Sequence, residues 1–322
     1  MQITDINRVV EDEFRAVNEE IARELSSDVP LVEHIAEYIV SSGGKRLRPL
    51  VTLLTGQMLG YREPPLITLA AIIEFLHTAT LLHDDVVDTS DMRRGRPTAN
   101  NKWGNAPSVL VGDFLYSRAF QMMVRIGNMP VMQTLADATN VIAEGEVLQL
   151  VNVRNPDLSI DNYNLVIRGK TAMLFAAAAQ SAACLATTDT KLQAAARTYG
   201  IELGMAFQIQ DDILDYSGDT AELGKNAGDD LAEGKVTLPL IRTLQTCPKA
   251  DRQTIRQIIR DGGTDDPGPV LTLVQNSGAL PYCRDRALQH SQRAIAALDV
   301  FPAGPGRDAL AGLADLAVNR VS

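Results

Sequence analysis

The sequence predicts an all-α fold, and three of its features support that prediction. Hydrophobic residues make up 45% of the 322 residues and aromatic residues only 5%, so the core is mostly aliphatic, which favours helix packing. Apolar residues recur at helical spacing along almost the whole chain. No segment has the short alternating runs of β-branched residues that mark strands. We therefore expect one all-α domain over residues 1–322.

The individual helices follow from this periodicity and from the residues that interrupt it. Val9, Phe14, Val17 and Ile21 share one face of a helix expected over 6–25. A break at 41–44 ends a second helix, and a polar, basic stretch at 89–105 and an acidic, glycine-containing stretch at 218–234 are expected loops. Breaks are also expected at 261–269 and 301–306. The other predicted helices cover 31–40, 66–88, 107–126, 130–151, 160–186, 191–216 and 237–244.

Composition narrows the classes of function and the cellular location. The formal net charge of -10 argues against a nucleic-acid partner, because phosphate backbones attract basic surfaces. Cys184, Cys247 and Cys283 are odd in number and widely spaced, which is typical of a reducing compartment. The stretch 174–186 is the most apolar and is shorter than the roughly 20 residues that span a bilayer. With no signal peptide at the N-terminus, we expect a cytoplasmic protein without a transmembrane segment.

Two aspartate clusters of identical spacing indicate metal chemistry. Asp84-Asp85-Val86-Val87-Asp88 ends one predicted helix, and its i,i+4 spacing sets Asp84 and Asp88 on nearly the same face. One such cluster is as compatible with an ordinary acidic helix end as with a metal site. Asp211-Asp212-Ile213-Leu214-Asp215 repeats the spacing in another long helix. Carboxylate ligands suit Mg²⁺, so the pair predicts a site for several ions and a diphosphate.

Basic residues that could bind a diphosphate gather near these clusters. They occur in Gly43-Gly44-Lys45-Arg46-Leu47-Arg48, in Arg93-Arg94-Gly95-Arg96, at Lys170-Thr171, and at Lys225 and Lys235. His77 lies two turns before Asp84 on the same face, but a lone histidine in an apolar helix is more simply a core residue. His83 is turned about 100° from Asp84 and has at most a supporting role. No Ser/His/Asp relay, dinucleotide fingerprint or P-loop is present.

Taken together, these motifs resemble those of the trans-isoprenyl diphosphate synthase (polyprenyl synthetase) family, and the whole chain is similar to its long-chain, octaprenyl branch. Further motifs of the resemblance are Gly112-Asp113-Phe114-Leu115, Phe207-Gln208 before the second cluster, and Gly224-Lys225-Asn226. The resemblance implies helices around a central cavity, a homodimer, and roughly two or three Mg²⁺ ions per active site.

The resemblance also assigns roles to individual residues. Both aspartate motifs and Lys170 are implied to be catalytic, with Asp84, Asp88 and Asp211 as metal ligands and Asp85, Asp212 and Asp215 completing the motifs. The residues implied to bind the allylic diphosphate are Arg93, Lys170, Thr171, Gln208, Lys225 and Lys235. Those implied to bind isopentenyl diphosphate are Lys45, Arg48, His77 and Arg94, so the family changes the interpretation of His77 from core residue to ligand.

The implied reaction is ionisation of an allylic primer, which by resemblance is farnesyl diphosphate, then attack by isopentenyl diphosphate and proton loss. Product length is expected to depend on side chains along a tunnel: small Ala79 and Thr80, then Phe75 and Leu76 one turn further, with Phe120 and Met123 (or Met122) on the neighbouring helix. Each could equally be ordinary core packing. The best single expectation is an octaprenyl product of about C40, serving as a side chain for ubiquinone synthesis.

Three alternatives stay open at this point. A terpene cyclase would have no use for a second-substrate site, so Lys45, Arg48 and Arg94 count against it. A shorter-chain synthase would stop at C15–C20. A non-catalytic subunit of a heteromeric synthase typically lacks an aspartate motif, whereas both are intact here.

Overall fold

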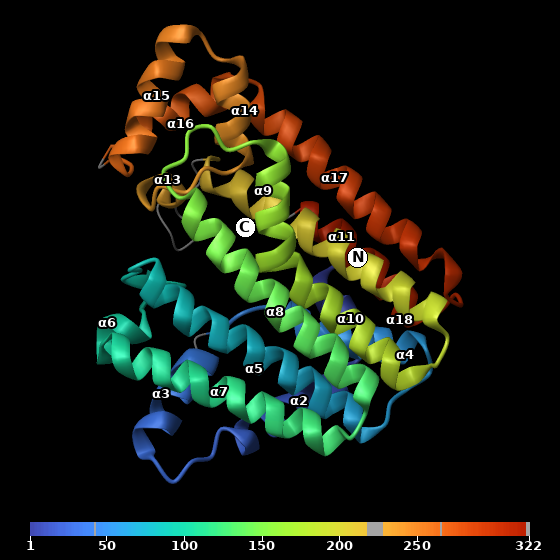
Figure 1. The fold of residues 1–322 in the computed structure, drawn as a ribbon. Helices are drawn as coiled ribbons and strands as arrows, with labels where there is room; N and C mark the ends of the chain where they lie inside the picture. Colours follow the sequence, from blue (N-terminus) through green and yellow to red (C-terminus); the bar gives the residue numbers. More distant parts are fainter. Residues whose placement is uncertain (42, 218–227, 265, 320–322) are drawn as a thin grey trace. The chain divides into compact units, whose positions relative to one another are not determined.

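The structure, a computed structural model, describes residues 1–41, 43–217, 228–264 and 266–319, and it is built almost entirely of helices (Figure 1). The predicted all-α fold is confirmed. Within the described residues the only strands are β1 (Met92–Arg93) and β2 (Arg96–Pro97), which pair antiparallel.

The chain divides into two compact units, which are described separately. Unit 1 comprises Met1–Ala138, Leu174–Gly200 and Ile295–Leu313, and unit 2 comprises Thr139–Met173, Ile201–Ala294 and Ala314–Ser322. The expected single domain over 1–322 stays a prediction.

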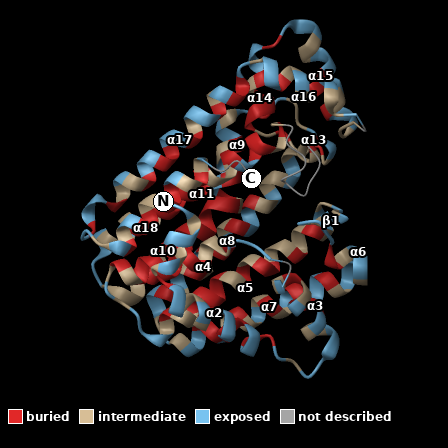
Figure 2. Cartoon of the chain, turned by 180° about the vertical axis from the view of Figure 1, so that it is seen from behind, coloured by how far each residue is buried: buried red, intermediate tan, exposed pale blue. Residues whose placement is uncertain are grey.

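Unit 1 holds the N-terminal helices and the hairpin. Its elements are α1 (Ile3–Arg8), α2 (Glu11–Glu24), α3 (Pro30–Ser41), α4 (Leu47–Met58), α5 (Pro64–Val87), β1, β2, α6 (Ala99–Trp103), α7 (Asn105–Ile126), and parts of α8 (Met129–Asn152), α10 (Met173–Ala186), α11 (Thr190–Asp215) and α18 (Pro305–Val318). Buried residues run along α4 from Pro49 to Gly56 (Figure 2).

Helix α5 is the core helix of unit 1. It begins with two prolines in its first turn, where a missing N–H does little harm, and its apolar side chains pack against α2, α4 and α7. Leu69, Ile72 and Phe75 are completely buried. By length and composition alone α5 is able to cross a membrane, whereas the 174–186 stretch singled out above is too short to meet that criterion. Its burial is that of a helix that is apolar all round because protein surrounds it.

The expected loop at 89–105 was wrong in part, because it contains regular structure. Arg94 and Gly95 form the two-residue turn between β1 and β2, both with positive φ (53° and 73°), as a tight hairpin requires. The Thr98 side chain then caps α6 by accepting a hydrogen bond from the Asn101 backbone N–H at 3.4 Å. Alternation of hydrophobic residues cannot reveal strands of two residues.

Two expected helices are also interrupted. The helix predicted over 6–25 is α1 and α2, separated at Val9 and Val10, whose φ of -133° is not helical. The helix predicted over 160–186 contains a π-helical turn, η1 (Arg168–Ala172), between α9 and α10.

Unit 2 holds the second aspartate motif. Its elements are α9 (Ile160–Ile167), η1, α13 (Asp229–Ala232), α14 (Leu238–Thr246), α15 (Lys249–Asp261), α16 (Gly268–Asn276), most of α17 (Ala279–Ala297), and parts of α8, α11 and α18. In this unit α8 approaches η1 so closely that a Cβ on Gly145 would lie 2.7 Å from the backbone nitrogen of Lys170. Glycine at 145 therefore permits the π turn that carries Lys170 and Thr171.

Candidate active site

A cluster of basic side chains lies in unit 1, where the turn before α4 meets the middle of α5. His77 Nε2 is 3.1 Å from Arg48 Nη1. Burial, then the charges of Arg48 and Arg94, hold the pKa of His77 well below its usual 6.5. The imidazole is therefore neutral near pH 7, and its Nε2 accepts the hydrogen bond from Arg48.

Arg48 is the most enclosed cation of this cluster. Its guanidinium carbon lies 4.4 Å from the centre of the Phe175 ring, a cation–π contact. Burial lowers the pKa of Arg48 to about 10, Glu74 opposes that change, and Arg94 adds to it. The side chain is thus still charged near neutral pH, and a bound anion would be stabilised beside it.

Arg94 reaches this cluster from the hairpin turn. A Cβ on Gly44 would lie 2.7 Å from Arg94 Nη1, so the glycine leaves room for the guanidinium to pack on the turn. Burial first, and then the charge of Arg93, lower the pKa of Arg94. The structure therefore brings three of the residues predicted for isopentenyl diphosphate together in unit 1: Arg48, His77 and Arg94. The fourth, Lys45, is exposed in the same glycine-rich turn.

Glu74 is a member of this cluster that the sequence analysis missed. Its carboxylate is 12% exposed and lies 3.9 Å from Arg46 Nε. Burial raises the pKa of Glu74, while Arg46, Arg48 and Arg94 act in the opposite direction. Its position one turn before His77, within an otherwise apolar helix, was the available signal.

The three aspartates of the first motif have different surroundings. Asp85 is completely buried, and its Oδ1 accepts a hydrogen bond from Arg93 Nε at 2.8 Å and lies 2.7 Å from Arg93 Nη2 in an ion pair. Asp84 and Asp88 are half-buried at the end of α5, and the Asp88 N–H donates to the Asp84 carbonyl at 2.8 Å. His83 is turned to α7, with Nε2 3.1 Å from the Val109 carbonyl oxygen. Arg93, predicted to bind diphosphate, is thus held by the motif itself.

The second motif, in unit 2, also has one buried aspartate and at least one that is more exposed. Asp211 is exposed, whereas Asp212 is 2% exposed and lies in a chain of buried hydrogen bonds. The Tyr163 hydroxyl donates to Asp212 Oδ2 at 2.5 Å, and Gln208 Nε2 donates to Oδ1 at 2.7 Å. The Thr171 hydroxyl donates to Gln208 Oε1 at 2.9 Å. Thr171 and Gln208, both predicted to bind the allylic diphosphate, are therefore in direct contact.

Asp215 organises the turn that begins α13. Its carboxylate oxygens accept hydrogen bonds from the backbone N–H groups of Asp229 at 3.2 Å and Asp230 at 3.3 Å. The charge of Asp230 in turn contributes, after burial, to raising the pKa of Asp212 well above its usual value. This anionic group is the kind of surrounding in which a bound cation is stabilising.

The predicted lysines of unit 2 form ion pairs. Lys170 Nζ is 2.6 Å from Glu146 Oε2, and Lys235 Nζ is 2.6 Å from Glu233 Oε2. Lys225 lies outside the described residues.

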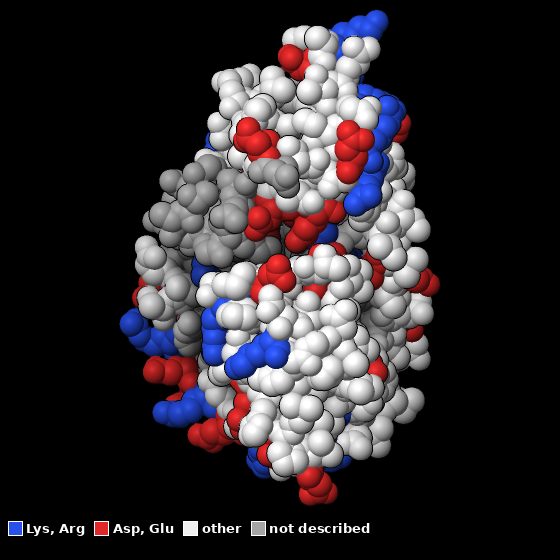
Figure 3. All heavy atoms as spheres, turned by 90° about the vertical axis from the view of Figure 1, so that its left-hand side faces the viewer, with Lys and Arg blue, Asp and Glu red and all other residues white. Residues whose placement is uncertain are grey.

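The available metal donors are carboxylate oxygens. Asp84 and Asp88 belong to unit 1 and Asp211 to unit 2, so the predicted ligand set draws on both units. In the described parts of the chain, no three His, Cys, Asp or Glu side chains form a closed metal cluster. A few carboxylates per ion, with positions left for water and phosphate oxygens, is the donor set that Mg²⁺ accepts. The chemistry of Asp84, Asp88 and Asp211 therefore suits Mg²⁺. Both signs of charge also occur together on the face drawn in Figure 3.

The residues predicted for the chain-length tunnel lie on α5 and α7 of unit 1. Phe75, Leu76, Ala79 and Met123 are buried, and Thr80 is half-buried. Phe120 is also half-buried and packs on Tyr116, with ring centres 5.3 Å apart.

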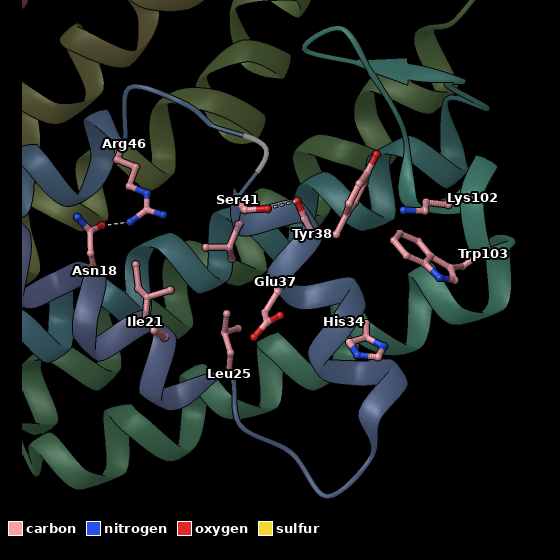
Figure 4. Close-up of a pocket in the computed structure, with 12 residues that line it drawn as sticks. Asn18, Ile21, Leu25, His34, Glu37, Tyr38, Ser41, Arg46, Lys102 and Trp103 are labelled. Carbon is pink, nitrogen blue, oxygen red and sulfur yellow. Dashed lines mark hydrogen bonds between the residues drawn. The ribbon is translucent and has the colours of Figure 1, made fainter.

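A separate cavity of about 700 Å³ in unit 1 contains none of these residues (Figure 4). Side chains of α2, α3 and α6 line it, together with Arg46, which bonds to Asn18 there and pairs with Glu74 of the basic cluster. Arg46 is therefore common to the cavity wall and the basic cluster.

Comparison with known proteins identifies the family. Residues 29–275 match the Polyprenyl synthetase family. The chain is 50% identical over 321 residues to the octaprenyl diphosphate synthase of Escherichia coli (strain K12), covering 99% of each chain. It is 47% identical to the all-trans-nonaprenyl-diphosphate synthase (geranyl-diphosphate specific) of Rhodobacter capsulatus, covering 98% of each.

A solved structure agrees with these sequence relatives. The polyprenyl synthase from Caulobacter crescentus CB15, complexed with calcium and isoprenyl diphosphate, superposes with a TM-score of 0.96 at 44% identity, covering 100% of this chain and 98% of the other. The superposition therefore extends over the full length of this chain. This chain belongs to the polyprenyl synthetase family of prenyltransferases.

Proposed function

We propose that this chain is a long-chain trans-polyprenyl diphosphate synthase, which adds isopentenyl units to an allylic diphosphate primer to make an octaprenyl product. The observation that carries this proposal is the 50% identity to an octaprenyl diphosphate synthase over 99% of both chains. The primer most consistent with it is farnesyl diphosphate.

The basic cluster of unit 1 is the part of the proposed site that binds isopentenyl diphosphate. Arg48 and Arg94 supply guanidinium groups, which match phosphate oxygens in bidentate geometry. The neutral His77 orients Arg48 from one side and the Phe175 ring supports it from the other. Glu74 limits the repulsion among the arginines before the anion arrives.

Asp84, Asp88 and Asp211 would bind the divalent metal, which we propose is Mg²⁺, roughly two or three ions per active site. Calcium accompanies the isoprenyl diphosphate of the Caulobacter protein, and this supports a divalent cation here. Metal bound by these carboxylates would neutralise the leaving diphosphate. Asp85 holds Arg93 beside the motif, where the guanidinium stabilises negative charge that develops on the leaving group.

Proton loss needs no strong protein base in this proposal. His77, the histidine of the basic cluster, is neutral and already accepts a hydrogen bond from Arg48. Attack by the isopentenyl double bond leaves a cation on its substituted carbon. The released pyrophosphate can take a proton from the neighbouring methylene, and the electrons of that C–H bond form the new double bond.

Product length depends, in this proposal, on where the growing tail meets a large side chain. Ala79 lies five residues before Asp84 and presents no such barrier, whereas Phe75 is one turn further along α5. A relative that is 47% identical over nearly the whole chain is a nonaprenyl diphosphate synthase, which supports side chains, rather than the fold, as what sets the length.

The setting of the reaction is also part of the proposal. A homodimer, a cytoplasmic location and delivery of the product to quinone synthesis follow from the family resemblance. Cys184, Cys247 and Cys283 are free thiols, which a reducing compartment maintains.

The proposal is tested on the purified chain with no other subunit. It should consume isopentenyl diphosphate with a farnesyl primer in Mg²⁺ and stop when chelator is added in excess. Asp84→Asn and Asp211→Asn should each reduce kcat, and the double variant should lose far less than the product of the two factors, because residues that act as a unit are not additive. Strict additivity, or activity that survives chelation, would contradict it. Turnover by the chain alone excludes a partner-only subunit.

A further inference from the structure

Four buried or half-buried side chains of unit 2 form a continuous chain of hydrogen bonds that begins outside the known motifs. Tyr163 of α9 donates to Asp212 of α11 at 2.5 Å, and Gln208 donates to the other oxygen of that carboxylate at 2.7 Å. Thr171 of η1 donates to Gln208 at 2.9 Å. Tyr163 therefore begins a series of hydrogen bonds that ends at Gln208 and Thr171, the two residues predicted to bind the allylic diphosphate.

Tyr163 is suited to be a permanent donor. It is 3% exposed, and burial together with the charge of Asp212 keeps the pKa of its hydroxyl well above 10. Asp212 is 2% exposed and has one donor on each oxygen. Without the hydroxyl, Asp212 Oδ2 would be a buried acceptor with its hydrogen bond lost, and the carboxylate would be free to rotate.

This series of hydrogen bonds fixes which way the Gln208 amide points. Its nitrogen faces a carboxylate and its oxygen faces the Thr171 hydroxyl, so turning the amide over would set its oxygen against Asp212. Two acceptors cannot share that contact. The direction of the amide, and with it the direction of the Thr171 hydroxyl, thus depends on where the Asp212 carboxylate is held.

We propose that Tyr163 is a positioning residue for the allylic substrate: by holding Asp212, it keeps Gln208 and Thr171 oriented for the allylic diphosphate. This inference rests on the proposed function, in which Gln208 and Thr171 bind that diphosphate. Tyr163 does not touch the substrate in this account, and it acts only through Asp212. The binding of isopentenyl diphosphate, which is assigned to the basic cluster of unit 1, should not depend on Tyr163.

The test compares two tyrosines that differ only in what their hydroxyls hold. Tyr163→Phe removes the donor to Asp212. Tyr199→Phe is the matched control, because Tyr199 is 1% exposed and its hydroxyl donates at 2.8 Å to the Leu310 carbonyl, within unit 1. In Tyr163→Phe the KM for farnesyl diphosphate should rise about tenfold, as is usual when a supporting hydrogen bond is removed. The KM for isopentenyl diphosphate should change less than about twofold, and Tyr199→Phe should leave both constants near wild type.

Two further measurements separate positioning from general damage. Calorimetric binding of farnesyl thiodiphosphate, whose bridging sulfur slows ionisation, should weaken about tenfold in Tyr163→Phe without any turnover. In an Asp212→Asn background, Tyr163→Phe should add little further loss, because the two residues act in series.

An unchanged KM for farnesyl diphosphate in Tyr163→Phe would overturn the proposal. So would equal rises in both KM values, or full additivity with Asp212→Asn. If the variant is too unstable to assay, Asp212→Asn alone must show the same selective rise in the farnesyl constant. Wild-type turnover is measured in the same series, so failure of the proposed function would appear there and failure of this inference only in the variants.

Discussion

The buried ion pair between Arg93 and Asp85 gives a quantitative prediction for Arg93→Ala. Asp85 is completely buried, and its Oδ1 accepts a hydrogen bond from Arg93 Nε at 2.8 Å and lies 2.7 Å from Arg93 Nη2 in an ion pair. Removing one partner of a buried pair costs about 3–5 kcal/mol, because the other charge is left uncompensated. The Arg93 side chain is 22% exposed, so we take the lower end, about 3 kcal/mol. At about 2–4 °C per kcal/mol, Tm should fall by about 6–12 °C.

The assay is urea and thermal unfolding of the substrate-free protein. Arg96→Ala is the control, since Arg96 is an exposed residue of the same hairpin whose described contact is a cation–π interaction with Tyr38 at 4.5 Å. It should lose no more than about 1 kcal/mol. Adding Asp85→Asn to Arg93→Ala should recover much of the loss, because the buried charge is then gone. Equal stability of Arg93→Ala and Arg96→Ala at neutral pH would refute this account of Asp85.

Three further predictions concern the basic cluster and the product. Folding lowers the pKa of His77, so His77 contributes stability above about pH 6.5 that is lost as pH falls toward the folded pKa. His77→Asn should therefore flatten the plot of unfolding free energy against pH between about pH 7 and 5. An unchanged slope would contradict this. Arg48→Lys keeps the charge but loses the planar guanidinium on His77 and Phe175, so the KM for isopentenyl diphosphate should rise about tenfold or more while that for the primer stays constant. Ala79→Tyr should shorten the product to C20 or less on chromatograms of the dephosphorylated alcohols, whereas an unchanged length would remove Ala79 from the tunnel.

Much of the helical architecture was predictable because helical periodicity is a local property of the sequence. The predicted helix over 191–216 is α11 within a residue at each end, and that over 107–126 differs from α7 by two residues at its start. The hairpin at 92–97 and the π turn at 168–172 were not predictable, because each depends on a contact with a distant segment or on only a few residues.

The site was predictable only at the level of motifs. The spacing of the aspartates does not show which members of each cluster are buried. In the structure Asp85 and Asp212 are buried and hydrogen-bonded, while Asp211 is exposed. That division depends on Arg93 and Tyr163, which meet the motifs through tertiary packing. Glu74 was missed for the same reason, since its three arginine neighbours come from the α4 turn and the hairpin.

In the proposed function this chain alone extends an allylic primer to an octaprenyl product. The product-length chromatogram of the purified enzyme, supplied with farnesyl diphosphate, labelled isopentenyl diphosphate and Mg²⁺, tests this. We expect one major product of eight isoprene units, about C40, and no product in excess chelator. A product that stops at C15 or C20, or pyrophosphate release without incorporation of label, would contradict it.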